Sequence, residues 1–541
     1  MIQFYIFIIL IYKEVKWQRG MSKSDGPAKK KARIEAWTTE KVAPTPPTRV
    51  GPFTSLPVKM DVVSESERRN MSQSIGSKRT TSKTSETKRK NTTRKMALKS
   101  FGQTVKQPKM LGQLLGNLCS RDSGSCLTFG KYVKPIKKLF NNFTFFKYAF
   151  PVARRIGTPS ANGFVYEITY ETQGIRAHTI LKCTLPPDNP NKSVDGLYYE
   201  YLVGLLFVND CYNRFPCFLE TYGVYHMNRA VVADISTKKT YNISDLKDQL
   251  NRFKPMTYDD SDTLKRQLRM SCEKQFDTCI LIQHISSSDS MDSYFKKNTK
   301  KKDYFCFELP HLLYQVYAPL AILGDTFTHY DLHRDNVLLY NLGNEKYIQM
   351  NYIFPHGATV SFKTHLICKI IDYGRSYFYT NDKVNSQNVY EKVCDACIDK
   401  KDPENKCGND NGYVWFNADD PLEDSYYIRS SIPNVSHDLR LLNEFKIDPR
   451  RALHVNYNCG ITKVFDHVYY EEMYGTPSHP ESVPGRIYNV MDAEVRLREL
   501  VLEPTFTAAN DAQYKSCACV GTLDIYMDPS SKKSMGFEPV Y

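Results

Sequence analysis

The sequence is poor in long apolar runs. The apolar stretch at its amino terminus, residues 1–12, is too short, because a helix needs about 20 apolar residues to cross the ~30 Å hydrocarbon core of a bilayer. No basic residue precedes the stretch, as in a secretory signal. We therefore expect no stable membrane insertion, with a weak membrane anchor as the alternative. Ordinary hydrophilic sequence begins at Met21, so residues 1–20 are predicted to be an apolar extension, and Met1 and Met21 are the alternative start positions.

The cysteines are too few and too scattered to form the dense, even framework of a small secreted domain. There are 15 in 541 residues, so we expect mostly reduced thiols in an intracellular, cytoplasmic or nuclear setting. Cys394 and Cys397 form a Cys-x-x-Cys pair, and Cys407 follows. Structural zinc takes four ligands, and a fourth is not obvious nearby, so zinc is not expected. The distant candidates for a fourth ligand are Cys459, Cys517 and Cys519.

The net charge of +14 is concentrated near the amino terminus. Residues 21–110 hold 21 Lys and Arg against 7 Asp and Glu, so the rest of the chain is close to neutral. Residues 21–125 are rich in Ser, Thr, Pro and Lys and have no sustained apolar period, which predicts a disordered basic tail. Such a tail solubilises the chain and can attract acidic partners. Its cluster Lys29–Arg33 could also serve as a nuclear-import patch.

A folded region is predicted to begin where aromatic residues become dense, near Leu139. Alternation in "FVYEITYE" and "AHTILKCTL", separated by the turn signal "TQG", predicts a hairpin. "LYYEYLVGLLFVNDCY" has apolar residues at helical spacing, "CILIQHI" suits a buried strand, and "FELPHLLYQVYAPLAILGD" is long enough for a buried helix. Strands followed by helices predict an α+β domain of two lobes.

The strongest local motif is "THYDLHRDNVLLY", residues 328–340. It resembles the catalytic loop of protein kinases, in which His-Arg-Asp-Leu is followed by three positions and Asn. His329, Asp331, Leu332 and Asn336 match that pattern, whereas Tyr330 replaces the usual Arg. Phosphoryl transfer needs a carboxylate to orient the attacking hydroxyl and accept its proton, and an amide oxygen nearby to ligate magnesium. The resemblance assigns these roles to Asp331 and Asn336.

Two more matches follow the family's order along the chain. Asp372, followed by Tyr and Gly after the apolar run "LICKII", is similar to the Asp-Phe-Gly motif, whose Asp holds magnesium. Lys182 ends the strand-like "TILK" as the family's Val-Ala-Ile-Lys lysine does. Glu200 lies 18 residues later on a predicted helix, so the resemblance implies a Lys182–Glu200 ion pair that positions the ATP phosphates. Asp195 is a poorer substitute for the glutamate.

The nucleotide-covering loop is the least regular match. Gly157 and Gly163 precede Val165, but the full Gly-x-Gly-x-x-Gly is missing, and a glycine-containing turn between strands is the alternative. The run "CILIQHI" resembles the strand that leads into the hinge between the lobes. On that resemblance, Gln283 and Ile285 would present backbone groups to adenine.

The resemblance covers residues 148–442, and the style of the motifs is similar to the Ser/Thr protein kinase-like proteins of large DNA viruses. It implies a bilobal kinase-like fold, with a small β-rich lobe over residues 140–235, a larger helical lobe over 236–490, and an extension over 491–541. It also implies that the chain uses ATP and Mg²⁺ and acts on a protein substrate. If the chain is viral, we expect it in the host cell or the virion. Asp438 in "NVSHDLRLL" is either the family's structural aspartate or a helix cap.

Three departures leave the substrate class open. His333 stands where Ser/Thr kinases usually carry Lys, a feature shared with small-molecule kinases of the aminoglycoside and choline type. No clear Ala-Pro-Glu follows Asp372, and the Asn336-to-Asp372 spacing is longer than usual. The expected function is an ATP- and Mg²⁺-dependent protein kinase acting on Ser/Thr hydroxyls, with His333 beside the catalytic group. The alternatives are a small-molecule kinase and a catalytically silent binding protein.

Overall fold

The computed structural model describes residues 129–540, except 145, 161–162, 173–174, 185–195, 253–265, 267–275, 286–287, 390–413, 416–427, 449, 451–458, 471–482 and 484. The expected apolar extension and basic tail lie outside the described residues. So do Asp195 and the cysteine cluster at 394–407. Within the described part of the chain, no helix is both long enough and apolar enough to span a bilayer.

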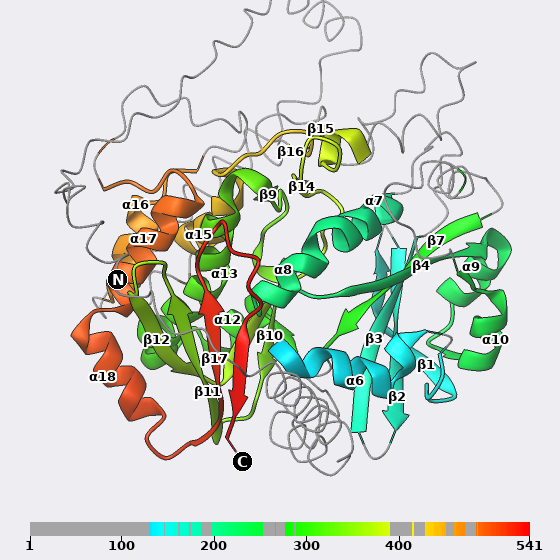
Figure 1. The fold of residues 1–541 in the computed structure, drawn as a ribbon, viewed down its shortest axis with the longest axis horizontal. Helices are drawn as coiled ribbons and strands as arrows, with labels where there is room; N and C mark the ends of the chain where they lie inside the picture. The colour runs from blue at the N-terminus through cyan, green and yellow to red at the C-terminus, as the bar shows by residue number, and fades with distance from the viewer. Residues whose placement is uncertain are drawn as a thin grey trace, which may run out of the picture. The chain divides into compact units, whose positions relative to one another are not determined.

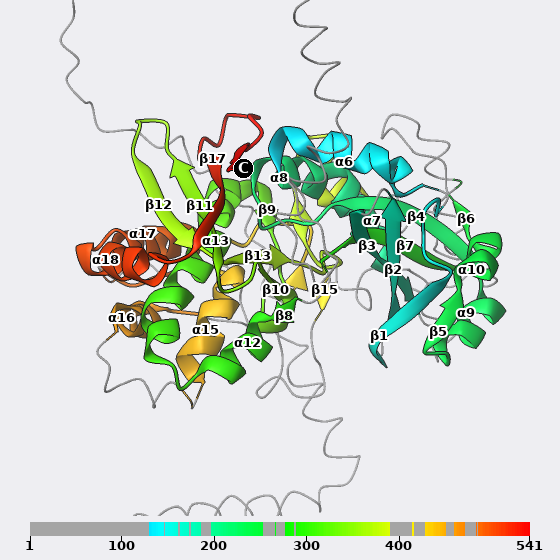
Figure 2. The same ribbon diagram turned by 90° about the horizontal axis from the view of Figure 1, so that it is seen from below.

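A seven-stranded antiparallel sheet has the strand order β5-β1-β2-β3-β7-β4-β6 (Figures 1 and 2). β2 and β3 form the predicted hairpin, and the predicted apolar strand is β7, an interior strand that pairs with both β3 and β4. The sheet therefore takes three strands from beyond residue 235, where we expected the first lobe to end. Its strands are β1 (Val152–Ser160), β2 (Gly163–Thr172), β3 (Ile175–Thr184), β4 (Thr221–Asn228), β5 (Thr240–Asn242), β6 (Asn251–Arg252) and β7 (Phe276–His284).

The two faces of this sheet differ, because successive side chains on a strand point in opposite directions. On one face, β2 and β3 contribute large apolar side chains to a buried cluster. Val165 and Lys182 are directly paired across these strands and belong to the other face. The buried face therefore fixes the direction in which Lys182 points. Its members on β2 and β3 include Phe164, Tyr166, Ile168, Tyr170, Leu181 and Cys183.

The predicted long buried helix is α13 (Leu309–Leu323), which has 13 buried residues out of 15 and lies within a second, larger apolar cluster. The other α-helices are α6 (Val133–Leu139), α7 (Gly196–Val203), α8 (Asn209–Arg214), α9 (Arg229–Ser236), α10 (Ile243–Gln249), α12 (Met291–Asn298), α15 (Arg440–Ile447), α16 (Gly460–His467), α17 (Val490–Val501) and α18 (Pro504–Gln513). Two π-helical segments are η3 (Gly204–Val208) and η4 (Tyr304–Glu308). The 3₁₀ turns are η1 (Gly130–Tyr132), η2 (Asn141–Phe143), η5 (Gly324–Thr326), η6 (Arg334–Asn336) and η7 (His437–Leu439).

Smaller sheets accompany these helices. Their strand orders are β13-β10-β8, β12-β11-β17-β18, β14-β9 and β15-β16. All their pairs are antiparallel except β11 with β17, and β12 lies beside α18 (Figure 2). The described chain is thus α+β, as predicted. The strands are β8 (Asp289–Ser290), β9 (Phe327–Thr328), β10 (Val337–Asn341), β11 (Lys346–Ile353), β12 (Thr359–Thr364), β13 (Leu366–Ile370), β14 (Tyr377–Phe378), β15 (Val414–Trp415), β16 (Ile428–Arg429), β17 (Ala518–Tyr526) and β18 (Gly536–Pro539).

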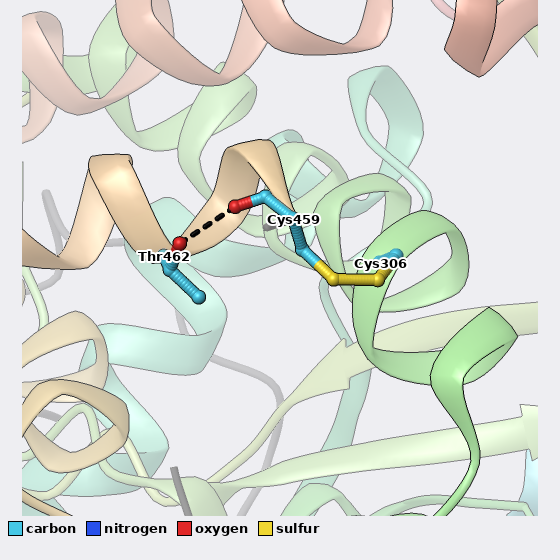
Figure 3. The surroundings of a disulfide bond; sticks show 3 residues. All are labelled: Cys306, Cys459 and Thr462. Atoms are coloured by element: carbon cyan, nitrogen blue, oxygen red, sulfur yellow. Dashed lines mark hydrogen bonds between the residues drawn. A yellow bond between two sulfur atoms is a disulfide. The ribbon is translucent and has the colours of Figure 1, made fainter. Parts of the chain in front are cut away.

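Among the described residues, one disulfide is an exception to the mostly reduced thiols that we expected. Cys306 in η4 is bonded to Cys459, the residue that precedes α16 (Figure 3). The hydroxyl of Thr462 donates to the carbonyl oxygen of Cys459 at 2.7 Å. Both cysteines are buried in the larger apolar cluster, which brings together two positions 153 residues apart in sequence. The described free cysteines are Cys183, Cys211, Cys217, Cys279, Cys368, Cys517 and Cys519.

A buried lysine gives the fold a pH dependence. Lys369 on β13 is fully buried, and its ammonium donates to the carbonyl oxygens of Pro216 and Phe218. Burial lowers the pKa of Lys369 to about 7, whereas an unfolded lysine holds its proton up to a pKa of about 10.4. Between these values the unfolded chain binds more protons than the native one, so the free energy of unfolding rises with pH.

The variant Lys369→Met tests this dependence. In the wild type we expect Lys369 to add up to ~1.4 kcal/mol of unfolding free energy per pH unit between pH 7 and 10. The variant should lack that increment, because methionine does not titrate. Urea unfolding at a series of pH values measures the slope. The exposed Lys238, paired with Asp234, provides a control in which Lys238→Met keeps the wild-type slope. Equal slopes in Lys369→Met and the wild type would contradict the assignment.

Candidate active site

Two carboxylates from separate parts of the chain contact the ammonium group of Lys182. Its Nζ lies 2.7 Å from Oε2 of Glu200 on α7 and 2.9 Å from Oδ1 of Asp372. Glu200 is nearly buried, whereas the Asp372 side chain is 45% exposed and so faces solvent in part. Residues 18 and 190 positions from Lys182 in sequence thus converge on one ammonium group. The sequence predicted the Lys182–Glu200 pair, and its contact with Asp372 places the two motifs side by side.

The charges in this cluster support one another. Burial would raise the pKa of Asp372, but the adjacent Lys182 ammonium outweighs burial and holds that pKa below its ordinary value. Burial would likewise lower the pKa of Lys182, yet Asp372 and Glu200 together raise it above its ordinary value. An ionised carboxylate beside a protonated lysine is therefore the stable state at neutral pH. The cluster combines a cation for phosphate oxygens with a carboxylate that suits a hard metal ion.

Local backbone geometry presents Asp372 to this cluster. Asp372 follows β13 after one intervening residue, Ile371, and adopts a left-handed backbone conformation with φ of 68°. Such a conformation is costly for a residue with a side chain and persists where surrounding contacts impose it. On the helix side, the hydroxyl of Tyr199 donates at 2.7 Å to the carbonyl oxygen of Ser376. The helix that carries Glu200 is thereby tied to the segment that follows Asp372.

The predicted catalytic loop is tied to the same segment through His329 and Asn336. His329 is fully buried, and Nε2 lies 2.9 Å from the carbonyl oxygen of Ile371, while Nδ1 accepts the backbone N–H of Asp331 at 3.2 Å. Burial lowers the pKa of His329 to about 4, so a neutral ring with its proton on Nε2 satisfies both contacts. The backbone N–H of Ile371 donates to the carbonyl oxygen of Asn336. The loop and the Asp372 segment are therefore held together.

Asp438 anchors this loop from the other side. Its two carboxylate oxygens accept the backbone N–H groups of His329 at 2.8 Å and Tyr330 at 3.0 Å. Tyr330 has φ of 63°, and its hydroxyl donates to the carbonyl oxygen of Ile432. Asp438 is the second residue of η7, whose N-cap position is occupied by Ser436, so Asp438 does not cap this turn. Of the two interpretations of Asp438, the structure supports the structural anchor.

The anchor predicts a loss of stability in Asp438→Asn. The amide has one acceptor oxygen, so its nitrogen would face one of the two backbone N–H groups without a bond. Leaving a buried donor unpaired costs about 1–3 kcal/mol, and we expect the unfolding free energy measured in urea to fall by about that amount. Asp335→Asn, on an exposed residue of the same loop, serves as the control and should be near neutral. Unchanged stability in Asp438→Asn would show that the anchor is dispensable.

Two arginines that sequence reasoning missed contact Asp331. Nη1 of Arg440, on α15, lies 2.9 Å from Oδ1, and Nη1 of Arg375 lies 3.7 Å from Oδ2. His333 lies 3.7 Å from Oδ1 through Nε2, while its Nδ1 accepts the backbone N–H of Asp335. The sequence did offer one signal for the two arginines, because Arg440 lies two residues after Asp438 and Arg375 lies three residues after Asp372. The carboxylate of Asp331 is thereby fixed in orientation, with cations close enough to meet developing negative charge.

A polar hollow of about 520 Å³ begins at the same loop. Arg334 lines it, with Nη1 at 2.7 Å from Oδ2 of Asp448 and its backbone N–H donating to Glu444. The hollow therefore lies next to the residues that follow Asp331, where an acceptor group would have to approach. Its lining residues are Asp292, Lys296, His333, Arg334, Asp335, Glu444, Ile447, Asp448 and Arg450.

The glycines assigned to the nucleotide-covering loop lie on β1 and β2. Gly157 has φ of 64°, and an added Cβ would meet nothing within 4 Å. Gly163 has φ of 154°, and a Cβ there would lie 2.1 Å from the carbonyl oxygen of Cys183. Close packing of β2 on β3 therefore requires Gly163. The turn between the two glycines includes residues outside the described part, so only its flanking strands bear on the predicted loop.

The predicted hinge residues lie at the carboxyl end of β7, with Gln283 in the strand and Ile285 directly after it. The backbone N–H of Gln283 donates to the carbonyl oxygen of Glu220 at 2.8 Å, so this donor is already used within the sheet. Ile285 is buried, and its carbonyl oxygen accepts the hydroxyl of Ser288 at 3.0 Å. Gln283 is thus engaged with the neighbouring strand, which sequence reasoning did not foresee.

Asn336 and Asp372 supply the oxygen atoms assigned to magnesium. The Asn336 side-chain nitrogen donates to the carbonyl oxygen of Asp331 at 2.9 Å, a bond that does not use its amide oxygen. Amide and carboxylate oxygens are the hard donors that Mg²⁺ prefers, so this pair fits the ion. Among the described residues, no group of three or more His, Cys, Asp and Glu side chains is placed to hold a metal.

Comparison with known proteins adds no family to these observations. No protein-family model matches the sequence, and a search of curated proteins finds no significant match.

Proposed function

We propose that this chain is an ATP- and Mg²⁺-dependent phosphotransferase with a bilobal, protein-kinase-like fold, acting on Ser/Thr hydroxyls of a protein substrate. The observation that carries the proposal is the convergence of Lys182 with Glu200 and Asp372 at 2.7 and 2.9 Å. The loop holding Asp331 is bonded to the residue before Asp372. These contacts support a single site that combines the Lys182 ammonium, the candidate metal ligand Asp372 and the candidate base Asp331.

The arrangement of the fold is compatible with this proposal. The antiparallel sheet packs one face into its own apolar cluster and presents Lys182 and Val165 on the other. The candidate loop follows α13 in the larger cluster. These placements support a site between a sheet-based lobe and a helical lobe, as the proposed bilobal fold requires. We place the small lobe around the seven-stranded sheet and the large lobe around α13.

Each residue has a defined role in this proposal. Lys182, held by Glu200, would bind the α- and β-phosphate oxygens of ATP. Asn336 and Asp372 would hold Mg²⁺, which neutralises phosphate charge that otherwise repels the nucleophile. Asp331 would orient the acceptor hydroxyl and take its proton as that oxygen bonds to the γ-phosphorus, while the bond from the γ-phosphorus to the bridging oxygen of the β-phosphate breaks and ADP leaves.

A second candidate function is supported by one observation. His333 lies beside Asp331 and lines the polar hollow, so a small polar acceptor could sit there instead of a peptide hydroxyl. Transfer of label from γ-labelled ATP to the two acceptor classes separates the candidates. We expect labelled Ser or Thr in a protein acceptor, with loss of label when EDTA is added. Label found only in aminoglycosides or choline would favour the second function.

A binding protein without catalysis is the third candidate. Lys182, Glu200 and Asp372 are all present and in contact, and Asp331 is present on the neighbouring loop, whereas a silent relative would be free to lose these charged groups. Mg²⁺-dependent turnover of ATP by the purified chain excludes this candidate. Absence of both turnover and transfer in the wild type would support it.

A further inference from the structure

The carboxyl-terminal segment contacts the far end of the helix that carries Glu200. α7, η3 and α8 follow one another without a gap over residues 196–214, with Glu200 near the start and Arg214 at the end. Nη2 of Arg214 donates at 3.0 Å to the carbonyl oxygen of Asp528, and the backbone N–H of Met535 donates at 2.9 Å to the carbonyl oxygen of Asn213. Both contacts come from the connection between β17 and β18. The carboxyl-terminal strand lies near α8 and α6 in Figures 1 and 2.

This connection is itself held on two sides. β17 pairs in parallel with β11, and the backbone N–H of Met527 continues the pairing with Ile353. Met527, Met535 and Phe537 are buried in the larger apolar cluster. An anchored segment that touches a helix end restrains that helix, because its own displacement would expose these side chains to water.

The first described residues close over the same segment. Phe129 and Tyr132 pack edge-on against the ring of Phe537 at 5.7 and 6.0 Å. Gly130 has φ of 54°, and an added Cβ would lie 2.8 Å from the carbonyl oxygen of Met535. A side chain at position 130 would therefore both strain the backbone and push the segment away.

The middle of the helix shows why such a restraint matters. Residues 204–208 are π-helical, and an added Cβ on Gly204 would lie 2.2 Å from Oγ1 of Thr221. Asn209 exchanges two hydrogen bonds with the backbone of Thr221. A π-helical segment interrupts the regular bonding of a helix and is often found at functional sites. The two ends of this helix are thus joined through an irregular turn and need separate restraints.

We propose that residues 527–537, which we name the carboxyl-terminal brace, position the α7–α8 helix and thereby the Lys182–Glu200 pair. The role of the brace in catalysis rests on the proposed phosphotransferase function. Arg214 is its positioning residue, since its guanidinium joins the helix end to the brace. Displacing the brace removes both bonds at the end of α8, leaves the start of α8 bonded to Thr221 through Asn209, and allows Glu200 to shift relative to Lys182.

Hydrogen exchange on the full chain without nucleotide tests the brace. In Arg214→Ala we expect amide exchange of residues 196–214 to accelerate about tenfold, while that of α13 stays at the wild-type rate, because local opening is independent of global unfolding. Arg214→Lys keeps a donor for the Asp528 carbonyl and should restore most of the protection. Arg176→Ala removes an exposed pair with Glu171 and should leave residues 196–214 unchanged.

A second variant reaches the brace from its other side. Gly130→Ala should accelerate exchange in α8 without altering any residue of the helix. Wild-type exchange of residues 196–214 in both Arg214→Ala and Gly130→Ala would overturn the proposal, and so would equal acceleration in α13.

The kinetic readout separates this proposal from the proposed function. We expect kcat of Arg214→Ala to fall about tenfold with the KM of the acceptor unchanged, because only orientation within the site is lost. If the wild type transfers no phosphoryl group, the proposed function fails while the exchange result still decides whether the brace positions the helix. Wild-type kcat with accelerated exchange would show that the brace does not position the catalytic pair.

Discussion

Asp331→Asn should strongly slow phosphoryl transfer while leaving ATP binding intact. The amide keeps the shape of the carboxylate and can still accept from Nη1 of Arg440, which lies 2.9 Å from Asp331. It cannot take the proton of the acceptor hydroxyl. A positioned general base contributes about 10²–10⁴-fold to the rate, so kcat should fall by about 10³ with the KM for ATP nearly unchanged.

Asp325→Asn is the matched control for this variant, because it makes the same change six residues before Asp331 and outside the polar hollow. Asp325 is exposed and lies in η5. Its kcat should stay close to that of the wild type. A normal transfer rate in Asp331→Asn would refute the role of Asp331. An equal loss in both variants would indicate damage to the local structure instead of loss of a base.

Lys182→Met should impair both binding and transfer. It removes the ammonium that lies between Glu200 and Asp372, so two carboxylates remain with no cation between them, where ATP phosphates must enter. Loss of a charged donor that stabilises the transition state lowers rates by about 10²–10³, and repulsion should raise the KM for ATP as well. Steady-state kinetics with varied ATP measures both constants.

The control for this change is Lys238→Met, at an exposed lysine paired with Asp234 on α9. It removes the same charge from the surface and should leave kcat/KM for ATP unaltered. Melting temperatures of both variants show whether the fold survives. A folded Lys182→Met protein with wild-type kcat/KM would remove Lys182 from the site.

The features that depend on residues close together in the sequence were the most predictable. Alternation over β2 and β3 predicted their hairpin and the strand that carries Lys182. The continuous apolar run at α13 predicted a buried helix. The motifs around Asp331 and Asp372 are local, so each could be recognised from a few adjacent residues. Their contacts with each other depend on the fold and followed only from the family resemblance.

Features set by contacts between distant segments could not be predicted in this way. Arg440 reaches Asp331 from 109 positions away, and an arginine on a helix is ordinary in sequence. The parallel pairing of β17 with β11 joins residues that no turn connects. The bond between Cys306 and Cys459 likewise spans 153 positions. Hydrophobic pattern specifies which faces are buried, but not which buried partner each face meets.

Calorimetric titration of ATP into the full chain, with Mg²⁺ and with EDTA, tests the central claim most directly. If Lys182, Asn336 and Asp372 surround one metal-bound triphosphate, ATP binds at a single site in Mg²⁺. We expect EDTA or Asp372→Asn to weaken that binding at least about tenfold, because each removes a partner from the metal bridge. Undetectable ATP binding by the wild type, or binding that neither EDTA nor Asp372→Asn alters, would contradict the account.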